Sequence, residues 1–177
     1  MERDITIFTT PELREQLVRA AEGKDQIAFF NQEAKNDMKI ASHTQGTILR
    51  PREIKSYDRG SGARTIPLVT GKIGSASLLN GITEFSPSAA IPLHTHNCEE
   101  SVMVLEGEAI AELDGIQYCL GTNDTTWIPA NTAHRFINAS DTKGMRIFWT
   151  YASINATRTI VATGDTRSID SEGNLEE

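Results

Sequence analysis

The sequence predicts an all-β domain preceded by a short helical arm, and three observations support this prediction. From about residue 38 onward, short runs rich in β-branched and aromatic residues are separated by Gly, Pro, Asn and Asp at intervals of roughly 8 to 12 residues. Asp114-Gly115 lies between two alternating segments and is a strong signal for a two-residue β-hairpin. The N-terminal residues show helical spacing instead. About ten short strands pack most naturally as a β-sandwich, a barrel or a jelly roll.

The N-terminal arm, residues 1–37, is predicted to hold one helix at about residues 11–22. Thr10 can cap this helix, Pro11 suits its first position, and apolar residues recur within it at helical spacing. The arm is too small to form a second hydrophobic core.

The β-domain is expected over residues 38–165, followed by an acidic C-terminal tail at 166–177. Runs of β-branched and aromatic residues bounded by turn residues define the expected strands. They are 47–50, 64–69, 75–85, 90–94, 100–105, 108–113, 116–120, 125–128, 134–138, 145–151 and 158–162.

Composition and charge exclude several classes of protein. The chain has 177 residues, which suits one domain, and its formal net charge is −7. An acidic chain without a basic run argues against nucleic acid as a partner, because that affinity is built from clustered Lys and Arg. No apolar run approaches the roughly 18 residues that would span a bilayer, so we expect a cytoplasmic protein with no membrane partner. Its two cysteines, Cys98 and Cys119, are expected to be free thiols.

Three of the four histidines lie close together in the sequence, and they predict a metal site. His94 and His96 are two residues apart, so on a strand both imidazoles point to one face, and Glu100 keeps the same parity. His134 comes from a later segment and completes the set if the two strands pair. Converging imidazoles would repel when charged and would need partners when neutral, so a divalent cation is the simplest physical explanation.

Two segments that contain these residues resemble a known family. The sequence His-Thr-His-Asn-Cys-Glu-Glu at 94–100, followed by Gly107, resembles the first cupin motif, and residues 124–138 resemble the second. The chain therefore resembles the cupin superfamily, in its small single-domain form, over about residues 65–153. The resemblance implies a cupin-type double-stranded β-helix, or jelly roll, and it implies the same four side chains as metal ligands.

The chain departs from the cupin pattern at three positions where a glycine is usual. These positions hold Ser88, Asn123 and Asn131. Asparagine tolerates left-handed backbone conformations better than other residues with a side chain, so the two asparagines keep the turns feasible. Ser88 is less suited to such a conformation, but it lies outside the ligand positions.

Alternation along the strands also predicts which side chains line a pocket beside the metal. Residues that share the parity of Glu100 and of His134 should face inward, together with small residues on the paired strand. Ordinary core packing is the alternative for each of these positions. The residues are Val102, Val104, Ala109, Ala111, Phe136 and Asn138.

Three imidazoles and one carboxylate suit one divalent transition metal per chain, and Fe, Mn, Ni, Co and Zn are not distinguished. Four protein ligands on an octahedral ion leave two positions open for a chelating substrate and for O₂ or water. We therefore expect a metal-dependent, dioxygenase-like oxidoreductase acting on a small oxygen-rich organic substrate. A non-catalytic small-molecule or metal-binding module and a metal-dependent isomerase or lyase are the alternatives, because cupins include many activities.

Glu100 is the expected catalytic residue, because a carboxylate can change its binding mode and accept a proton. Which of Arg64, Arg135 and Arg146 faces the pocket is left open by the sequence. A homodimer is expected, with the N-terminal arm or residues 158–162 covering a sheet edge of the partner.

Overall fold

The structure is a computed structural model that describes residues 46–170. The helix expected at residues 11–22, the rest of the arm and His43 lie outside the described residues. So does the end of the expected acidic tail, residues 171–177. Within the described part of the chain, no helix has the length and hydropathy needed to cross a bilayer.

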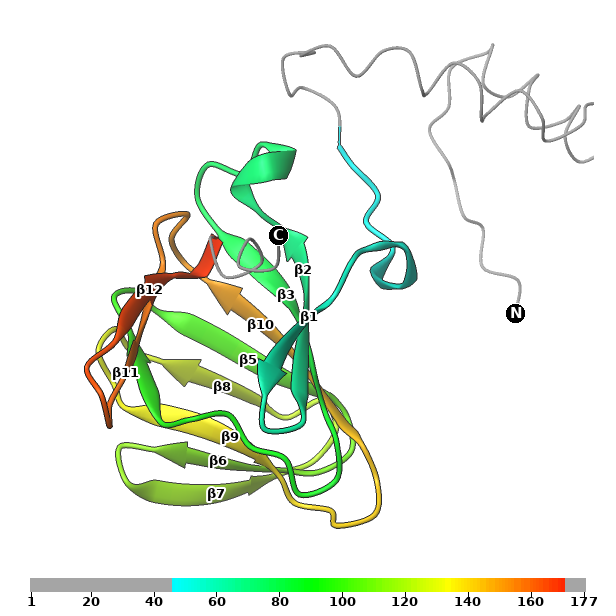
Figure 1. Cartoon of the computed structure of the whole chain (residues 1–177), viewed down its shortest axis with the longest axis vertical. Helices are drawn as coiled ribbons and strands as arrows, with labels where there is room; N and C mark the ends of the chain where they lie inside the picture. Colours follow the sequence, from blue (N-terminus) through cyan, green and yellow to red (C-terminus); the bar gives the residue numbers. More distant parts are fainter. Residues whose placement is uncertain (1–45, 171–177) are drawn as a thin grey trace, which may run out of the picture. The chain divides into compact units, whose positions relative to one another are not determined.

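The described residues form two six-stranded antiparallel sheets, which confirms the all-β prediction (Figure 1). The strand order is β1-β2-β3-β10-β5-β8 in one sheet and β12-β11-β4-β9-β6-β7 in the other. Two short 3-10 helices, η3 (Pro51–Glu53) and η4 (Gly71–Ile73), accompany them. The strands are β1 (Tyr57–Gly60), β2 (Ala63–Val69), β3 (Leu79–Phe85), β4 (His94–His96), β5 (Glu100–Glu106), β6 (Ala109–Leu113), β7 (Ile116–Leu120), β8 (Thr125–Ile128), β9 (His134–Asn138), β10 (Met145–Tyr151), β11 (Thr157–Ile160) and β12 (Thr166–Ser168).

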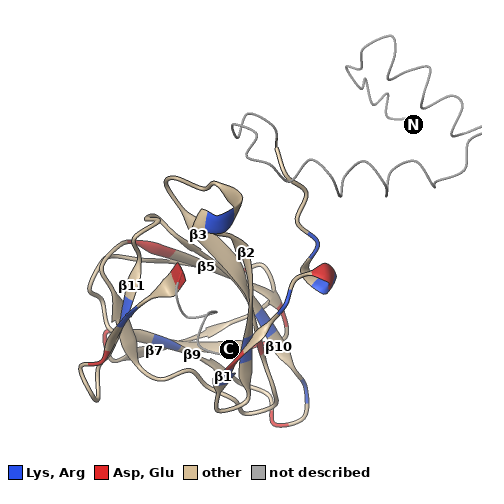
Figure 2. Ribbon diagram, turned by 45° about the horizontal axis from the view of Figure 1, so that its top comes forward, with Lys and Arg blue, Asp and Glu red and all other residues tan. Residues whose placement is uncertain are grey.

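The hydrophobic core lies between the two sheets, as the period-2 pattern requires. β10 and β9 alternate buried and half-buried positions along their whole length, and β5 alternates buried and exposed positions over Glu100–Val104. Figure 2 looks into the barrel, with strands of both sheets arranged around its interior. The inward-facing residues of both sheets therefore form one core. Most of them are apolar, so the buried polar side chains among them need an explanation.

The β6–β7 hairpin forms at Asp114-Gly115, as predicted. Both residues have positive φ, at 49° and 80°, and the flanking Leu113 and Ile116 pair directly. Two consecutive positive φ values define the type I′ turn, whose twist matches that of the strands.

The three residues that replace motif glycines all adopt left-handed backbone conformations. The φ angles are 58° at Ser88, 75° at Asn123 and 64° at Asn131. The N–H of Asn131 donates to the carbonyl of His96 at 2.7 Å, so this turn is joined directly to β4. The two asparagines keep the turns, as expected, and Ser88 adopts the same geometry despite its lower tolerance for it.

The structure corrects the expected elements at both ends of the barrel and before β4. Residues 47–50 form no strand, whereas Tyr57–Gly60 form β1, which pairs with β2. Only His94 of the expected strand 90–94 lies in β4, because Pro92 has no N–H to contribute to a ladder. The fold also extends beyond residue 165. Polar β12 pairs with β11, and Ile169 is buried in the core.

Gly81 allows the side chain of Trp149 to pack on β3. A larger residue at this position should therefore destabilise the fold. A Cβ at residue 81 would overlap the Trp149 ring and lie 2.6 Å from the carbonyl oxygen of Ile66. We expect Gly81→Ala to lower the free energy of unfolding by about 1–3 kcal/mol or more, as overpacking does. Urea denaturation measures this change. Gly121→Ala is the control, because its nearest neighbour is 3.8 Å away and a change within about 0.5 kcal/mol is expected. Equal stability of the two variants would contradict the prediction.

Candidate metal centre

Four side chains of the predicted site meet where the two sheets approach each other. His94 and His96 lie on β4, His134 begins β9, and Glu100 begins β5 of the opposite sheet. β4 and β9 pair at His94 and His134, so the later histidine lies directly across the ladder from the first. We call these four side chains the His/Glu cluster.

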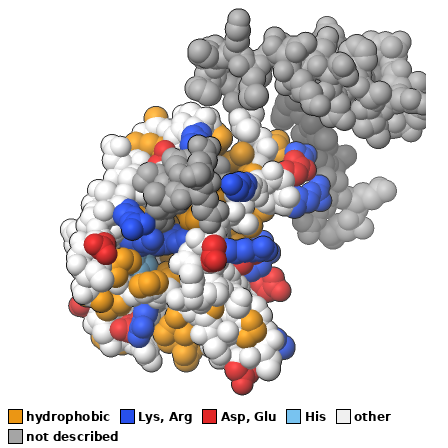
Figure 3. Space-filling model, viewed as in Figure 1, with side chains coloured by type: hydrophobic (Ala, Val, Ile, Leu, Met, Phe, Trp, Pro, Cys, Tyr) orange, Lys and Arg blue, Asp and Glu red, His pale blue; other side chains and the backbone are white. Residues whose placement is uncertain are grey.

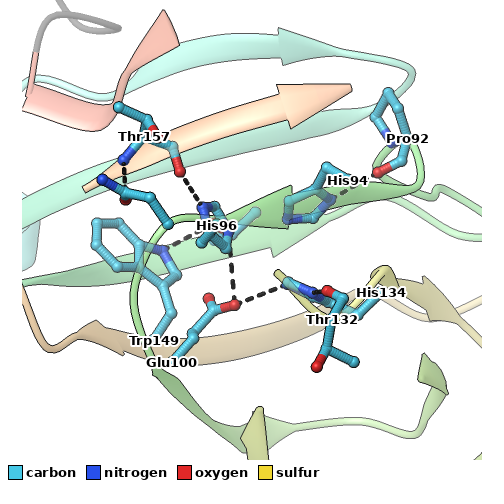
Figure 4. A network of polar contacts seen from close by, with 10 residues as sticks. Pro92, His94, His96, Glu100, Thr132, His134, Trp149 and Thr157 are labelled. Atoms are coloured by element: carbon cyan, nitrogen blue, oxygen red, sulfur yellow. Dashed lines mark hydrogen bonds and ion pairs between the residues drawn. The ribbon is translucent and has the colours of Figure 1, made fainter. Parts of the chain in front are cut away.

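The ligand atoms of the His/Glu cluster lie within 4.8 Å of one another, and all four residues are buried. His134 is 1% exposed and Glu100, the most exposed of the four, is 5% exposed. Figure 4 shows Glu100 and the rings of His96 and His134 directed toward a common point, with His94 beside them. A shared coordination centre accounts for such convergence of buried donors.

Each imidazole is oriented by a hydrogen bond from its Nδ1 to a backbone carbonyl. His94 bonds to Pro92 O at 2.7 Å, and His134 bonds to Thr132 O at 2.8 Å. His96 bonds to Thr157 O, also at 2.8 Å. A carbonyl oxygen only accepts hydrogen bonds, so each Nδ1 carries a proton. In a neutral ring, the lone pair is then on Nε2, and this is how metal-binding histidines are commonly held.

Three atoms at the centre of the cluster lack hydrogen-bond partners. They are His96 Nε2, His134 Nε2 and Glu100 Oε2. Glu100 Oε2 is 2.8 Å from His134 Nε2 and 3.6 Å from His96 Nε2, but neither contact has hydrogen-bond geometry. Buried polar atoms without partners are costly and uncommon, and one cation among them would satisfy all three. The residues present therefore fit a metal.

Burial and neighbouring charges shift the pKa values of the three histidines. Burial, followed by repulsion from the other two imidazoles, holds the pKa of His94 well below its ordinary value. Burial also lowers the pKa of His96, although the Glu100 carboxylate opposes this effect. For His134, burial acts in the same direction but the contact with Glu100 outweighs it, so its pKa is raised. His94 and His96 are therefore neutral donors, whereas a cation would compete with a proton at His134.

A small cavity of about 20 Å³ borders the His/Glu cluster, and one residue of the expected pocket lines it, Phe136. The other five expected residues are buried but do not line this cavity. Val102, Val104, Ala109 and Ala111 belong to the hydrophobic core. The amide of Asn138 donates to the carbonyls of Ser86 at 2.9 Å and Lys143 at 2.7 Å, where it joins two loops.

Arg59 of β1 also lines this cavity, and the sequence did not predict it. The three arginines considered from the sequence bind carboxylates: Arg64 and Arg146 contact Glu84, and Arg135 contacts Glu112 at 2.7 Å. Arg59 was missed because β1 is short and its sequence, Tyr-Asp-Arg-Gly, lacks the β-branched residues that mark a strand. The signal that would have found it is the Gly-Ser-Gly turn that follows, which predicts a hairpin.

Hydroxyl and aromatic groups also line the cavity, among them Thr83, Trp149 and Tyr151. Trp149 Nε1 donates to Thr83 Oγ1 at 3.0 Å, and Thr83 Oγ1 hydrogen-bonds to Thr65 Oγ1 at the same distance. The ring of Tyr151 lies 4.4 Å from that of His96, centroid to centroid.

Both cysteines are free thiols, as expected, with Cys98 half-buried and Cys119 exposed. Burial, followed by the nearby Glu100 carboxylate, raises the pKa of Cys98. Cys98 therefore remains protonated at neutral pH, which disfavours it as a nucleophile or a ligand.

Comparison with known proteins identifies a domain that contains the site. Residues 81–151, which contain the whole His/Glu cluster, match the Cupin domain family. With the jelly-roll fold of the described residues, this match shows a cupin domain in this part of the chain.

The individual proteins that match this chain do so over a short stretch or at low sequence identity. Auxin-binding protein 1 of Arabidopsis thaliana is 34% identical over 80 residues, which cover 36% of this chain and 40% of that protein. The polyketide cyclase RemF from Streptomyces resistomycificus is similar with a TM-score of 0.57 at 17% identity, covering 75% of this chain and 95% of its own. An oxalate oxidase in complex with glycolate gives a TM-score of 0.59 at 18% identity, covering 70% and 68%. The last two likenesses concern the fold alone.

Proposed function

We propose that the His/Glu cluster holds one divalent transition metal per chain. The observation that carries this proposal is the set of three histidines whose Nδ1 atoms are hydrogen-bonded to carbonyls, together with unpartnered Nε2 and carboxylate atoms facing one another. Three imidazoles and a carboxylate suit Fe, Mn, Ni, Co and Zn alike.

We further propose that the protein is a dioxygenase-like oxidoreductase acting on a small oxygen-rich organic substrate. A redox-active metal at this site supplies Lewis acidity and electron exchange with O₂. The three histidines provide fixed donors, because each ring is held at its backbone-facing nitrogen. Glu100 is the proposed proton acceptor. A carboxylate can change its binding mode at a metal, so Glu100 can take a proton from a substrate hydroxyl.

A small-molecule-binding module is the second candidate, and the match to Auxin-binding protein 1 favours it. The name of that protein refers to binding and not to a catalysed reaction. Of the three proteins described above, it is the one that is more than 30% identical to this chain. In this candidate the same cluster holds the metal, and the organic molecule is bound but not converted.

The decisive experiment is metal analysis of protein purified without chelators, followed by O₂ uptake on a panel of enols and catechols. We expect about one equivalent of metal per chain and O₂ uptake with at least one compound. Saturable binding of a panel compound without O₂ uptake or chemical change would favour the binding module. A protein that neither retains nor takes up a divalent metal would contradict both candidates.

We also propose that the protein forms a homodimer. β7 and β8 are edge strands of their sheets, and they expose Ile116 (59%), Tyr118 (46%) and Trp127 (64%). Exposed apolar side chains on edge strands support pairing with a second copy. Residues 158–162 are a poor choice for that contact, since β11 already pairs with β4 and β12.

The dimer is tested by sedimentation equilibrium at micromolar concentration. The parent should have twice the mass of the chain, and Trp127→Lys should shift the equilibrium toward monomer. A parent that is monomeric throughout this range would contradict the proposal.

A further inference from the structure

A second cavity, of about 340 Å³, is lined by residues of β2, of η4 and of the segment 49–57. We call it the β2 groove. None of the four residues of the His/Glu cluster lines it. Three of its lining residues belong to the hydrophobic core: Leu79, Trp149 and Ile169. Its volume lies within the range of about 300–1,000 Å³ that is typical of small-molecule sites.

A β-bulge in β2 shapes this groove. The register between β2 and β3 shifts between Pro67 and Val69. Pro67 has no N–H to give to the ladder, and the Val69 N–H donates to the side-chain Oδ1 of Asn80 at 3.1 Å. Pro67, Leu68 and Val69 all line the groove, whereas in a regular strand Leu68 would point to the opposite face.

The apolar lining of the β2 groove is only partly covered. On the face drawn in Figure 3, exposed hydrophobic side chains lie beside Lys and Arg side chains near η4, the helical turn that Figure 1 shows between β2 and β3. Covering such side chains with an apolar molecule is favourable, because it removes apolar surface from water. The half-buried apolar residues that line the groove are Leu49, Ile54, Pro67, Leu68, Val69 and Ile73.

The charged residues at the groove favour an anionic group on the ligand. Lys55, Lys72 and Asp170 line it, so its lining has a net charge of +1, whereas the whole chain has a net charge of −7. Lys55 is exposed, and it forms no ion pair with any residue in the range 46–170. A single ammonium matches a ligand with one negative charge, such as a carboxylate.

We propose that the β2 groove binds a small amphipathic carboxylate, with an aliphatic chain against the apolar lining and the carboxylate beside Lys55. The chain is aliphatic because most of the apolar side chains around the groove are aliphatic. This site is separate from the proposed metal centre and needs no metal. Trp149 lines both the groove and the cavity beside the His/Glu cluster, so its fluorescence can report binding.

The test titrates full-length Trp127→Phe protein with straight-chain carboxylates from pentanoate to octanoate. The chain has two tryptophans, and Trp127 is exposed, so this variant leaves Trp149 as the fluorescent reporter. Each added methylene should raise the affinity about 3-fold to 4-fold, as burial of one methylene group does. Zn²⁺-loaded and metal-free protein should bind octanoate equally well.

Filling the groove should abolish this binding. In the same background, Val69→Phe should weaken octanoate binding at least about 10-fold, because the larger side chain takes the space of the aliphatic chain. Ile73→Phe fills the groove from η4 and should have the same effect. Val161→Phe is the matched control, since Val161 is exposed and does not line the groove. Thermal unfolding identifies the variants that remain folded.

The charge is tested with Lys55→Gln. It should weaken octanoate binding about 2-fold to 5-fold, the range expected for an exposed ion pair, and should leave the binding of uncharged 1-octanol unchanged. Lys143→Gln removes the same charge from an exposed lysine outside the groove, so octanoate affinity should not change.

Three results would each overturn the inference. The first is an octanoate affinity that is undetectable or does not depend on chain length. The second is folded Val69→Phe or Ile73→Phe protein that binds octanoate as tightly as the parent. The third is binding that requires Zn²⁺, since this would place the carboxylate at the His/Glu cluster. A chain that takes up no metal would contradict the proposed function but would leave this test unchanged.

Discussion

His134→Ala is expected to weaken metal binding more than 100-fold. Its Nε2 is one of four donor atoms, and even changes to residues that only orient a ligand typically cost 10-fold to 100-fold in affinity. The ring lies directly across the ladder from His94 and its Nε2 is 2.8 Å from Glu100 Oε2, so no other described side chain is placed to replace it. Competition with a chelator of known affinity, read by metal analysis, measures the change.

His43→Ala is the control for this experiment, because His43 is the remaining histidine and lies outside both motifs. Its metal affinity should equal that of the parent. Thermal unfolding of the metal-free forms separates loss of a ligand from loss of the fold, since His134 is buried. If folded His134→Ala protein bound metal as tightly as the parent, the His/Glu cluster would not be the metal site.

Glu100→Gln is expected to retain appreciable metal but to lose turnover by about 100-fold or more. Glutamine has nearly the same shape and keeps an oxygen donor, but it cannot accept a proton at neutral pH. General base catalysis typically contributes 100-fold to 10,000-fold to a rate. The measurement is O₂ uptake with a substrate found in the panel, divided by the metal content of each preparation.

The neighbouring carboxylate provides a matched control. Glu99 comes immediately before Glu100, outside β5, and its side chain is exposed, whereas Glu100 is buried. Glu99→Gln should retain full turnover. Full turnover in Glu100→Gln would contradict the proposed role of this carboxylate, and turnover that survives complete metal removal would contradict the proposed metal chemistry.

Several strands of the barrel and the members of the His/Glu cluster were predictable from the sequence, because both depend on local periodicity. β7, β8, β9 and β10 form at the expected residues, where each run of strand-forming residues is bounded by turn signals. His94 and His96 share a face because they are two residues apart on a strand, whatever the rest of the chain does.

Strands with weak local signals were not predictable in the same way. β1 and β12 are short and polar, and each exists because a neighbouring strand offers an unpaired edge. The place of the expected pocket residues along their strands was not predictable for a related reason. Parity identifies the face on which Val102 or Ala111 lies, but not whether that position is near the open end of the barrel or in the packed core.

By itself, the sequence determined an all-β fold, two free thiols and four side chains able to hold a metal. The tertiary structure decided what surrounds them. The hydrogen bond from His96 to Thr157 joins residues 61 positions apart, and Arg59 reaches the cavity through a hairpin far from either motif. These contacts depend on which strands become neighbours when the sheets close. That pairing minimises the free energy of the whole domain, whereas residue spacing reports only the geometry of one strand at a time.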